Sequence, residues 1–320
     1  MTQRHDARPD LDVAVIGAGM TGITCARDLA AAGLRVAIYD KGRGIGGRMA
    51  TRRLDGGVLL DHGAQYLRPR NAAFAAVLTE AQRQGHAATW DPGDGPTFVG
   101  ANGMAGLMRG LAEGLDVPQS SKVSALTPLP QGWRLSFADD AVTARRVVLT
   151  IPPAQATALI GPQHRLADRL AAVVMAPSIT LLAVLDGDAP RPFRSRKGVG
   201  ATAWIAQDGT KPGRPSDGSV SWILQTDADF ARDHIDMAPD AMAGLLVPHL
   251  CAALDAQPAQ ILSASAHRWL YAHVTRPLGS HFLSDRATGL WIGGDWCLGP
   301  LAENAWASGS AIAAGIIHDR

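Results

Sequence analysis

Two glycine-rich turns near the start of the chain have residue types and a spacing that bind nucleotide phosphates. The first turn, over 17–22, directly follows the apolar run 13–16 and opens an Ala-rich stretch over 20–32 that has helical spacing. Gly17 permits a tight turn, Gly19 lets backbone amides approach a pyrophosphate, and Gly22 lets the helix lie close to the strand. The helix N-terminus then offers free amides and a partial positive charge to the phosphate.

An acidic residue follows this turn at the distance that dinucleotide binding requires. Asp40 ends the next apolar run, over 34–39, and lies 18 residues after Gly22. This is close to the spacing of about 20 residues in the Rossmann pattern. A carboxylate there accepts hydrogen bonds from both ribose hydroxyls and repels a 2′-phosphate, which argues against NADP at this site. Strand, turn, helix and acidic residue are all present, so a glycine loop without a ligand is the weaker alternative.

The second turn begins directly after Asp40. It combines the glycine pair Gly46 and Gly47 with basic residues on both sides, which are Lys41, Arg43 and Arg48. Such a turn suits a backbone nest with a guanidinium contact to phosphate, although a solvated basic turn is the alternative. A domain that binds only NAD would have an ordinary helix here, so the two turns together predict FAD.

The C-terminal end adds a third candidate segment. A strand ends in Gly293, Gly294 and Asp295, and a helix rich in small residues is expected over 303–317. We expect the helix N-terminus to direct its dipole at the pyrimidine edge of a flavin, and Asp295 to bind the ribityl or phosphate portion. The alternative is a packing helix without a ligand. The buried-strand pattern over 145–153 suits the strand that returns the chain to the nucleotide domain.

Four segments resemble one known family over nearly the whole chain. The runs 40–53, 61–66, 266–272 and 294–297 are similar to the bacterial renalase group of the amine-oxidase-like FAD flavoproteins. The resemblance implies non-covalent FAD and oxidation of dihydro isomers of NAD(P)H to NAD(P)+, by hydride transfer to flavin N5. Oxygen would take the electrons and give H2O2. It also implies a backbone contact from Val123 to the adenine, and it places Gln65 and Tyr66 beside the flavin ring.

The predicted sites follow from the motifs and the resemblance together. The expected cofactor-binding residues are Gly17, Gly19, Met20, Thr21, Gly22, Asp40, Lys41, Arg43, Gly46, Gly47, Arg48, Ala64, Gln65, Val123, Thr150, Gly294, Asp295, Asn304 and Ala305. The expected pocket residues are Gln65, Tyr66, Trp269 and Tyr271, and no metal site is expected. For the other large aromatics, including Trp204, Trp222, Trp296 and Trp306, core packing is preferred to a pocket role. His267 is interpreted as a core histidine, and His62 stays open between core and pocket.

Three rival functions remain, one of which is an NAD-binding regulatory domain. An amine oxidase or desaturase uses the same scaffold, but none of the four lysines aligns with the flavin-facing lysine of those enzymes, and their cysteine motif for flavin attachment is absent. A flavin-binding sensor without turnover is the rival from another class. No Ser-His-Asp, Cys-His or metal-ligand pattern is present, which fits hydride transfer that depends on orientation.

Composition and patterning set the expected architecture. The chain has 320 residues, 47% of them hydrophobic, and a formal net charge of +1, so neither nucleic acid nor a membrane is expected as a partner. Small-molecule substrate and O2 are the expected partners. The polar start without a secretory segment, and three cysteines without disulfide spacing, predict a cytoplasmic protein.

The predicted fold is α/β with two domains. A Rossmann-type FAD-binding domain of the glutathione-reductase kind is expected over 1–66, 100–152 and 286–320. A second, α+β substrate domain, built on a mostly antiparallel sheet, is expected over 67–99 and 153–285. Helices are predicted over 71–84, 104–114 and 239–254, and strands over 117–126, 132–137, 179–185, 201–206 and 220–225.

Overall fold

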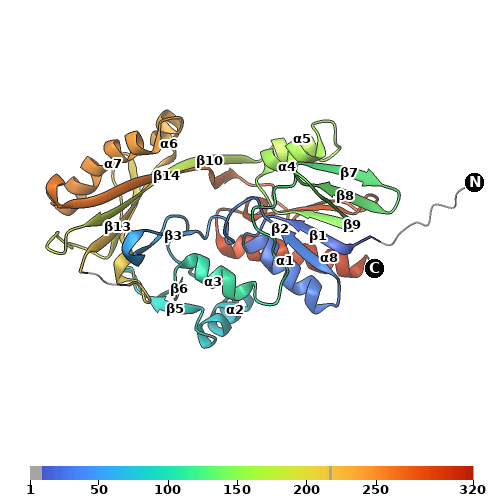
Figure 1. Cartoon of the computed structure of the whole chain (residues 1–320), viewed down its shortest axis with the longest axis horizontal. Helices are drawn as coiled ribbons and strands as arrows, with labels where there is room; N and C mark the ends of the chain where they lie inside the picture. Colours follow the sequence, from blue (N-terminus) through green and yellow to red (C-terminus); the bar gives the residue numbers. More distant parts are fainter. Residues whose placement is uncertain (1–8, 216–217, 320) are drawn as a thin grey trace, which may run out of the picture. The chain divides into compact units, whose positions relative to one another are not determined.

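The structure is a computed structural model that describes residues 9–215 and 218–319, and it divides into two compact units (Figure 1). Unit 1 consists of Met1–Gly47, Ala112–Val174 and Arg276–Arg320, and unit 2 of Arg48–Leu111 and Met175–Thr275. The boundaries differ from the predicted ones, because 48–66 and 100–111 belong to unit 2 whereas 153–174 and 276–285 belong to unit 1.

The centre of unit 1 is a sheet with a parallel core. Its path runs β15-β16-β9-β1-β2, and β8 and β7 continue from β9. β1 pairs in parallel with β2 and with β9, and β9 pairs in parallel with β16. The strands are β1 (Leu11–Ile16), β2 (Val36–Tyr39), β7 (Ala125–Leu129), β8 (Gly132–Ser136), β9 (Ala141–Leu149), β15 (Leu283–Asp285) and β16 (Leu290–Ile292). The predicted Rossmann-type order of strand, turn, helix and strand is confirmed.

Two helices lie side by side in unit 1 (Figure 1). α1 (Met20–Ala31) follows the first glycine turn, and α8 (Ala302–His318) ends the chain. A side chain at Gly309 would place its Cβ 2.4 Å from the carbonyl oxygen of Thr21, so glycine sets how closely the helices approach. The short helices α4 (Pro153–Ile160) and α5 (Ala167–Ala171) complete this unit.

One predicted strand of unit 1 is wrong in its bounds. The segment over 117–124 is not a strand, and β7 starts only at Ala125. Its backbone instead runs beside the end of β2 and the loop after it. The Pro118 carbonyl accepts from the Asp40 amide, and the Gly42 carbonyl accepts from the Ser120 amide. β7 also runs through Pro128, beyond the predicted end of the strand at residue 126.

Unit 2 contains a five-stranded sheet in the order β11-β12-β13-β10-β14. The pairs β11–β12, β12–β13 and β10–β13 are antiparallel, as predicted for the second domain. The strands are β10 (Val174–Leu185), β11 (Ser195–Lys197), β12 (Thr202–Gln207), β13 (Val220–Thr226) and β14 (Ile261–Arg276). Both faces of β10 are covered, which explains its nearly continuous apolar sequence.

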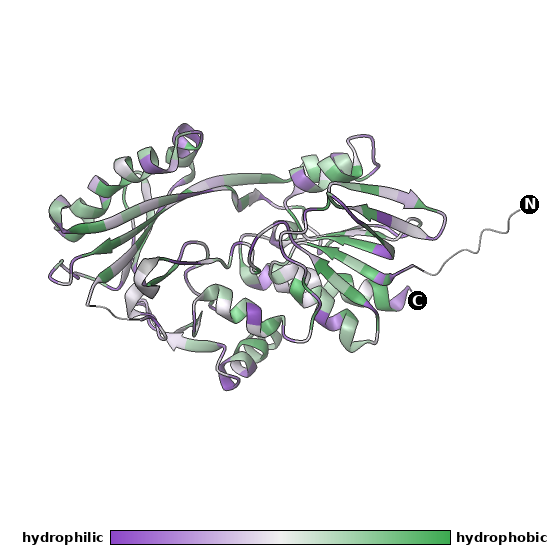
Figure 2. Ribbon diagram, in the orientation of Figure 1, coloured by the Kyte–Doolittle hydropathy of each residue, from purple (hydrophilic) through white to green (hydrophobic). Residues whose placement is uncertain are grey.

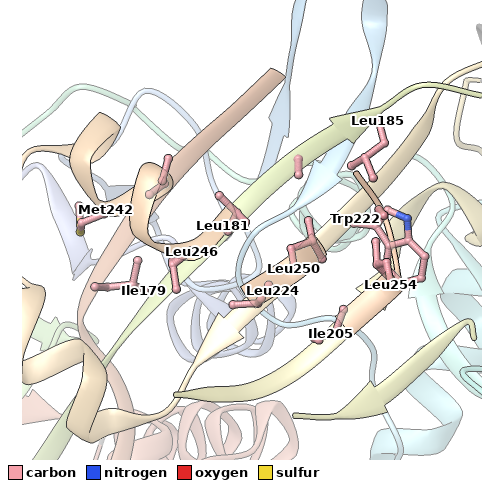
Figure 3. Close-up of a cluster of buried hydrophobic side chains, with 14 of the residues drawn as sticks. Ile179, Leu181, Leu185, Ile205, Trp222, Leu224, Met242, Leu246, Leu250 and Leu254 are labelled. Carbon is pink, nitrogen blue, oxygen red and sulfur yellow. The ribbon is translucent and has the colours of Figure 1, made fainter. Parts of the chain in front are cut away.

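A hydrophobic core lies between this sheet and α7 (Pro239–Leu254) (Figure 3). Leu181 and Leu185 of β10 pack with Leu246 and Leu250 of α7. The intervening residues of β10 point to the opposite face, where Leu182 joins a smaller cluster. α7 carries hydrophobic and hydrophilic residues together, in keeping with one covered and one exposed side (Figure 2).

Smaller elements complete unit 2. They are the strand pairs β3 (Thr51–Arg53) with β4 (Leu59–Asp61) and β5 (Ala87–Trp90) with β6 (Thr97–Gly100), and the helices α2 (Ala72–Arg83), α3 (Met104–Leu111) and α6 (Ala228–His234). Asn71 caps α2, since its side chain accepts from the amides of Ala73 and Phe74.

No helix within 9–215 or 218–319 combines the length and the apolar character that crossing a bilayer requires. Residues 1–8, which carry most of the polar start used to predict localisation, lie outside the described residues.

Candidate functional site

The first glycine turn has the backbone that its sequence predicts. Gly17 has a φ of 111°, which favours glycine, and a Cβ on Gly22 would lie 2.0 Å from the Gly17 carbonyl oxygen. Space around Gly19 is open, and this residue begins α1 without a side-chain cap. The first amides of α1, including those of Met20 and Thr21, therefore face an open approach that suits a phosphate.

Asp40 joins the two glycine turns. Its Oδ2 accepts from the Ala18 amide at 2.7 Å, and its Oδ1 accepts from the Gly42 amide at 2.7 Å. The carboxylate is partly buried and retains lone pairs for a ribose, because an ionised carboxyl group accepts about four hydrogen bonds. From the sequence, Asp40 was predicted only to bind a ligand. The hydrogen bonds by which it links the two turns were not predicted.

The second turn lies against the first. The Gly46 amide donates to the Ala18 carbonyl at 2.8 Å, and a Cβ on Gly47 would lie 3.5 Å from the Gly19 Cα atom. Both Gly46 and Gly47 have positive φ values, 113° and 55°. Lys41 and Arg43 are exposed beside this turn, and Lys41 donates to Gln155. Arg48 belongs to unit 2, where it donates to the carbonyl of Ala272.

Two further predicted residues support the turns from within unit 1. The Thr150 hydroxyl donates toward the carbonyls of Ile16 and Gly17, at 3.0 and 2.9 Å, so it holds the first turn. Val123 is buried, in the non-strand segment beside Asp40 and the loop after it. The predicted backbone contact of Val123 with adenine stays a prediction.

The C-terminal segment is tied to the same unit. Thr21 Oγ1 donates to the Ala305 carbonyl at 2.9 Å, which links the start of α1 to the first turn of α8. The Gly294 amide donates to Ser308 Oγ, a buried residue that sequence reasoning did not single out. Asp295 is buried, and Asn304 lies near Gly299 at the start of α8. The predicted residues of three distant chain segments are therefore brought together in unit 1.

The remaining predicted residues belong to unit 2 and gather around the segment 61–66. Gln65 is buried, and its Nε2 donates to the carbonyls of Asp61 and Gly63. The Ala64 amide donates to the Arg48 carbonyl at 2.8 Å. A Cβ on Gly63 would lie 2.0 Å from that same carbonyl oxygen, so this glycine permits the close approach.

Two histidines and a tryptophan pack together next to this segment. The ring of His62 stacks on Trp269 at 5.4 Å and meets His267 edge-on at 4.7 Å. Trp269 Nε1 also donates to the His62 carbonyl at 2.9 Å. His62 Nδ1 is buried, and among the described residues it has no hydrogen-bond partner. The cluster unites His62, left open by the sequence, with His267 and the predicted pocket residue Trp269.

The two imidazoles are held neutral at physiological pH. Burial lowers the pKa of His62 to about 4, with further lowering by His267 and the cation of Arg52. Burial also lowers the pKa of His267 to about 4, helped by the positive charges of Arg52 and Arg268.

Tyr66 belongs to a separate aromatic group. Its ring lies 6.3 Å from that of Trp90 and 5.8 Å from that of Trp204. Tyr271 is half-buried on β14. Trp222 and Trp296 are fully buried, as the preference for core packing anticipated.

All three cysteines, Cys25, Cys251 and Cys297, are buried and free. Burial raises the pKa of the Cys297 thiol to about 12 and also raises the pKa values of Cys25 and Cys251. These thiols are therefore poor nucleophiles.

Two family models match the chain. Residues 15–81 match an NAD(P)-binding Rossmann-like domain, and residues 89–317 match the flavin containing amine oxidoreductases. Since the second match covers most of the chain, the protein belongs to the family of flavin containing amine oxidoreductases. These matches establish the family. They do not assign the chain to the renalase group, which the sequence resembles.

Individual relatives agree with this family. Putrescine oxidase from Kocuria rosea is 38% identical over 69 residues, which are 22% of this chain and 14% of that protein. A solved double mutant of putrescine oxidase superposes with a TM-score of 0.76 at 15% identity, covering 96% of this chain and 99% of that chain. Cyclohexylamine oxidase from Brevibacterium oxydans gives 0.71 at 13% identity, covering 97% and 99%. The solved structures establish the fold.

Proposed function

We propose that this protein is an FAD-dependent oxidase of the amine oxidase type. It oxidises the carbon–nitrogen bond of a small amine to an imine, and O2 is reduced to H2O2. The observation that carries the proposal is the pair of glycine turns braced by Asp40, in a chain whose residues 89–317 match the amine oxidoreductase family. When bound, FAD supplies the acceptor for the substrate hydride and passes the electrons to oxygen.

The residues of unit 1 fit this cofactor. The open N-terminus of α1 and the turn with Gly46 and Gly47 would bind the pyrophosphate, and Asp40 would bind the adenosine ribose. The remaining predicted contacts, from Val123 to the adenine and from Asp295 and the start of α8 to the flavin portion, belong to the same proposal. Non-covalent binding is supported by the sequence, which lacks the cysteine motif that attaches the flavin in related amine oxidases.

A second candidate substrate is a dihydronicotinamide dinucleotide, whose oxidation also removes a hydride from a carbon of a nitrogen heterocycle. One observation favours it. Burial is the main cause that lowers the pKa values of His62 and His267, and the positive charge of Arg52 lowers both further, so a cation lies beside this cluster in unit 2 and favours a phosphate-bearing ligand over a cationic amine.

Anaerobic reduction of the bound flavin separates the two substrates. The purified protein is mixed without oxygen with putrescine, cyclohexylamine or benzylamine, and separately with dihydro isomers of NADH and NADPH. Bleaching of the flavin absorbance by an amine supports the amine oxidase proposal. Bleaching by dihydronicotinamides alone replaces it with the second candidate, and a protein that binds no FAD overturns both.

A further inference from the structure

A buried group of four charged side chains lies at the segment 61–66 in unit 2, and one of the four belongs to the first residue of that segment. It consists of Asp61, Asp208, Lys211 and Arg214, and each of these side chains is at most 2% exposed. Two carboxylates face two cations, so the group is neutral as a whole. We call it the ion cluster. Burial on its own raises the pKa of Asp61, but the charges of Lys211 and Arg214 outweigh burial and lower it.

Lys211 uses its three donors on two members of the ion cluster and on Gln65. Its Nζ lies 2.5 Å from Asp208 Oδ1, 3.1 Å from Asp61 Oδ2 and 3.2 Å from the side-chain oxygen of Gln65. Arg214 also binds both carboxylates, through Nε to Asp208 at 2.8 Å and through Nη2 to Asp61. Among the hydrogen bonds of the described residues, Lys211 is therefore the one charged side chain of the ion cluster that binds the side chain of Gln65.

Gln65 in turn fixes the turn that contains it. Its Nε2 donates to the carbonyls of Asp61 and Gly63, so the side chain closes the segment upon itself. Lys211 occupies the one remaining polar atom of the amide group. Without the lysine, this oxygen would stay buried and unpaired, and such a group disfavours the observed arrangement.

The loop that contains Lys211 also supports Tyr66. Trp90 Nε1 donates to Thr210 Oγ1 at 3.1 Å, and Lys211 Nζ lies 5.5 Å from the centre of the Trp90 ring. Trp90 is one of the two tryptophans packed near Tyr66. A single stretch over 208–211 thus contacts the side chain of Gln65 directly and that of Tyr66 through Trp90.

We propose that Lys211 is a positioning residue, which holds Gln65 and Tyr66 in the one arrangement that the oxidation requires. This rests on the proposed function and on the family resemblance, which implies that those two residues lie beside the flavin. Neutralisation of the two aspartates is shared with Arg214, whereas orientation of the Gln65 amide is specific to Lys211.

Two charge-balanced double variants separate positioning from simple charge balance. K211M/D208N removes one cation and one carboxylate, and leaves Asp61 paired with Arg214. R214M/D208N removes the same carboxylate and the other cation, and leaves Lys211 bound to Asp61 and Gln65. Because both variants lose one buried ion pair, their folding stabilities should be similar.

The first measurement is amide exchange of the full chain without substrate. The amides of His62 and Ala64 are bonded to the carbonyls of Ala50 and Arg48, so they report on this segment. We expect faster exchange in K211M/D208N than in R214M/D208N. Equal exchange in the two variants would leave Lys211 as a merely structural residue. This readout does not depend on the substrate, so it stays valid if the proposed function fails.

The second measurement is the rate of anaerobic flavin reduction at saturating substrate. We expect K211M/D208N to be slower than R214M/D208N by about tenfold or more, since small displacements in an active site cost such factors. Similar rates, with equal melting temperatures, would overturn the proposal. If neither variant folds, the single variants K211R and R214K, which keep the charges but change the donor geometry of one cation each, replace the two double variants in both measurements.

Discussion

At the scale of single residues, Asp40 has a structural role beside its proposed role as the ribose ligand. Its carboxylate accepts from the Ala18 and Gly42 amides. A buried or partly buried hydrogen bond to a charged group contributes about 1.5–3 kcal/mol. The arrangement of both turns should therefore depend on this carboxylate.

We expect Asp40→Ala to weaken FAD binding by about tenfold or more, because the loss of one such bond corresponds to at least that factor. Titration of the apoprotein with FAD, followed by flavin fluorescence, measures the effect. Asp12→Asn is the matched control, since Asp12 forms an exposed ion pair with Arg35 in the same unit, and such pairs contribute little. An unchanged affinity in the Asp40 variant would contradict the assignment of the ribose site.

The histidine pair gives a prediction for pH dependence. Both pKa values fall to about 4 in the folded protein from the ordinary 6.5, so the unfolded chain binds more protons between these limits. The contribution to stability is complete above pH 6.5 and is lost as the pH falls toward 4. We expect His267→Gln to make the fall of the melting temperature between pH 7 and pH 5 shallower than in the unchanged protein.

Ser263→Ala controls for substitution on the same strand, because Ser263 is exposed on β14 and leaves both imidazoles in place. Its melting temperature should follow the unchanged protein at every pH. A His267→Gln profile as steep as that of the unchanged protein would show that this imidazole is not buried neutral.

At the scale of elements, two glycines in helices differ in the space that is available for a side chain. Gly309 in α8 faces the backbone of α1, where a Cβ would lie 2.4 Å from the Thr21 carbonyl oxygen. Gly244 in α7 is exposed and has open space around it. The same substitution at these two positions therefore tests helix packing against helix propensity.

We expect Gly309→Ala to lower the free energy of unfolding by about 1–3 kcal/mol, because the backbone of α1 cannot yield to the added methyl group. Gly244→Ala should raise it by about 0.5–1 kcal/mol, since alanine favours a helix over glycine. Denaturant unfolding of the two variants checks both signs. A stabilised Gly309→Ala variant would mean that α1 and α8 do not approach as closely as described.

Elements with local signals were predictable from the sequence. Helix α7 has the bounds expected from its proline start and apolar pattern, and α1 follows from the glycine turn. The strand expected over 117–126 failed, because its backbone follows β2 and the adjoining loop, which no local pattern encodes. The ion cluster was missed for the same reason: Lys211 and Asp61 are 150 residues apart in the chain.

At the scale of the whole chain, the division into units depends on such distant contacts. Helix α3 was assigned to the nucleotide-binding domain, yet its first residues bind unit 2. The Met104 amide donates to Asp61, and the Ala105 amide donates to Thr51. Polar side chains that satisfy a helix N-terminus therefore place the boundary of the unit, and the sequence pattern of the helix itself does not reveal them.

The predicted FAD-binding residues of unit 1 come from several stretches of the chain, including 17–22, 40–47 and 294–305. A ligand that contacts all of them stabilises only the folded unit, by about 2.7 kcal/mol at a concentration 100-fold above its dissociation constant. Removal of FAD should lower the melting temperature, and its return should restore it. FMN, which lacks the adenosine portion that Asp40 would bind, should restore less.

Release of the flavin on unfolding completes this prediction. Because the chain lacks the cysteine motif for flavin attachment, the flavin should separate from the denatured chain by filtration. Flavin that remains on the chain after denaturation would contradict non-covalent binding. Equal recovery of the melting temperature with FMN and FAD would instead contradict the role of the first glycine turn and Asp40, since those elements would then contribute nothing to the stabilised state.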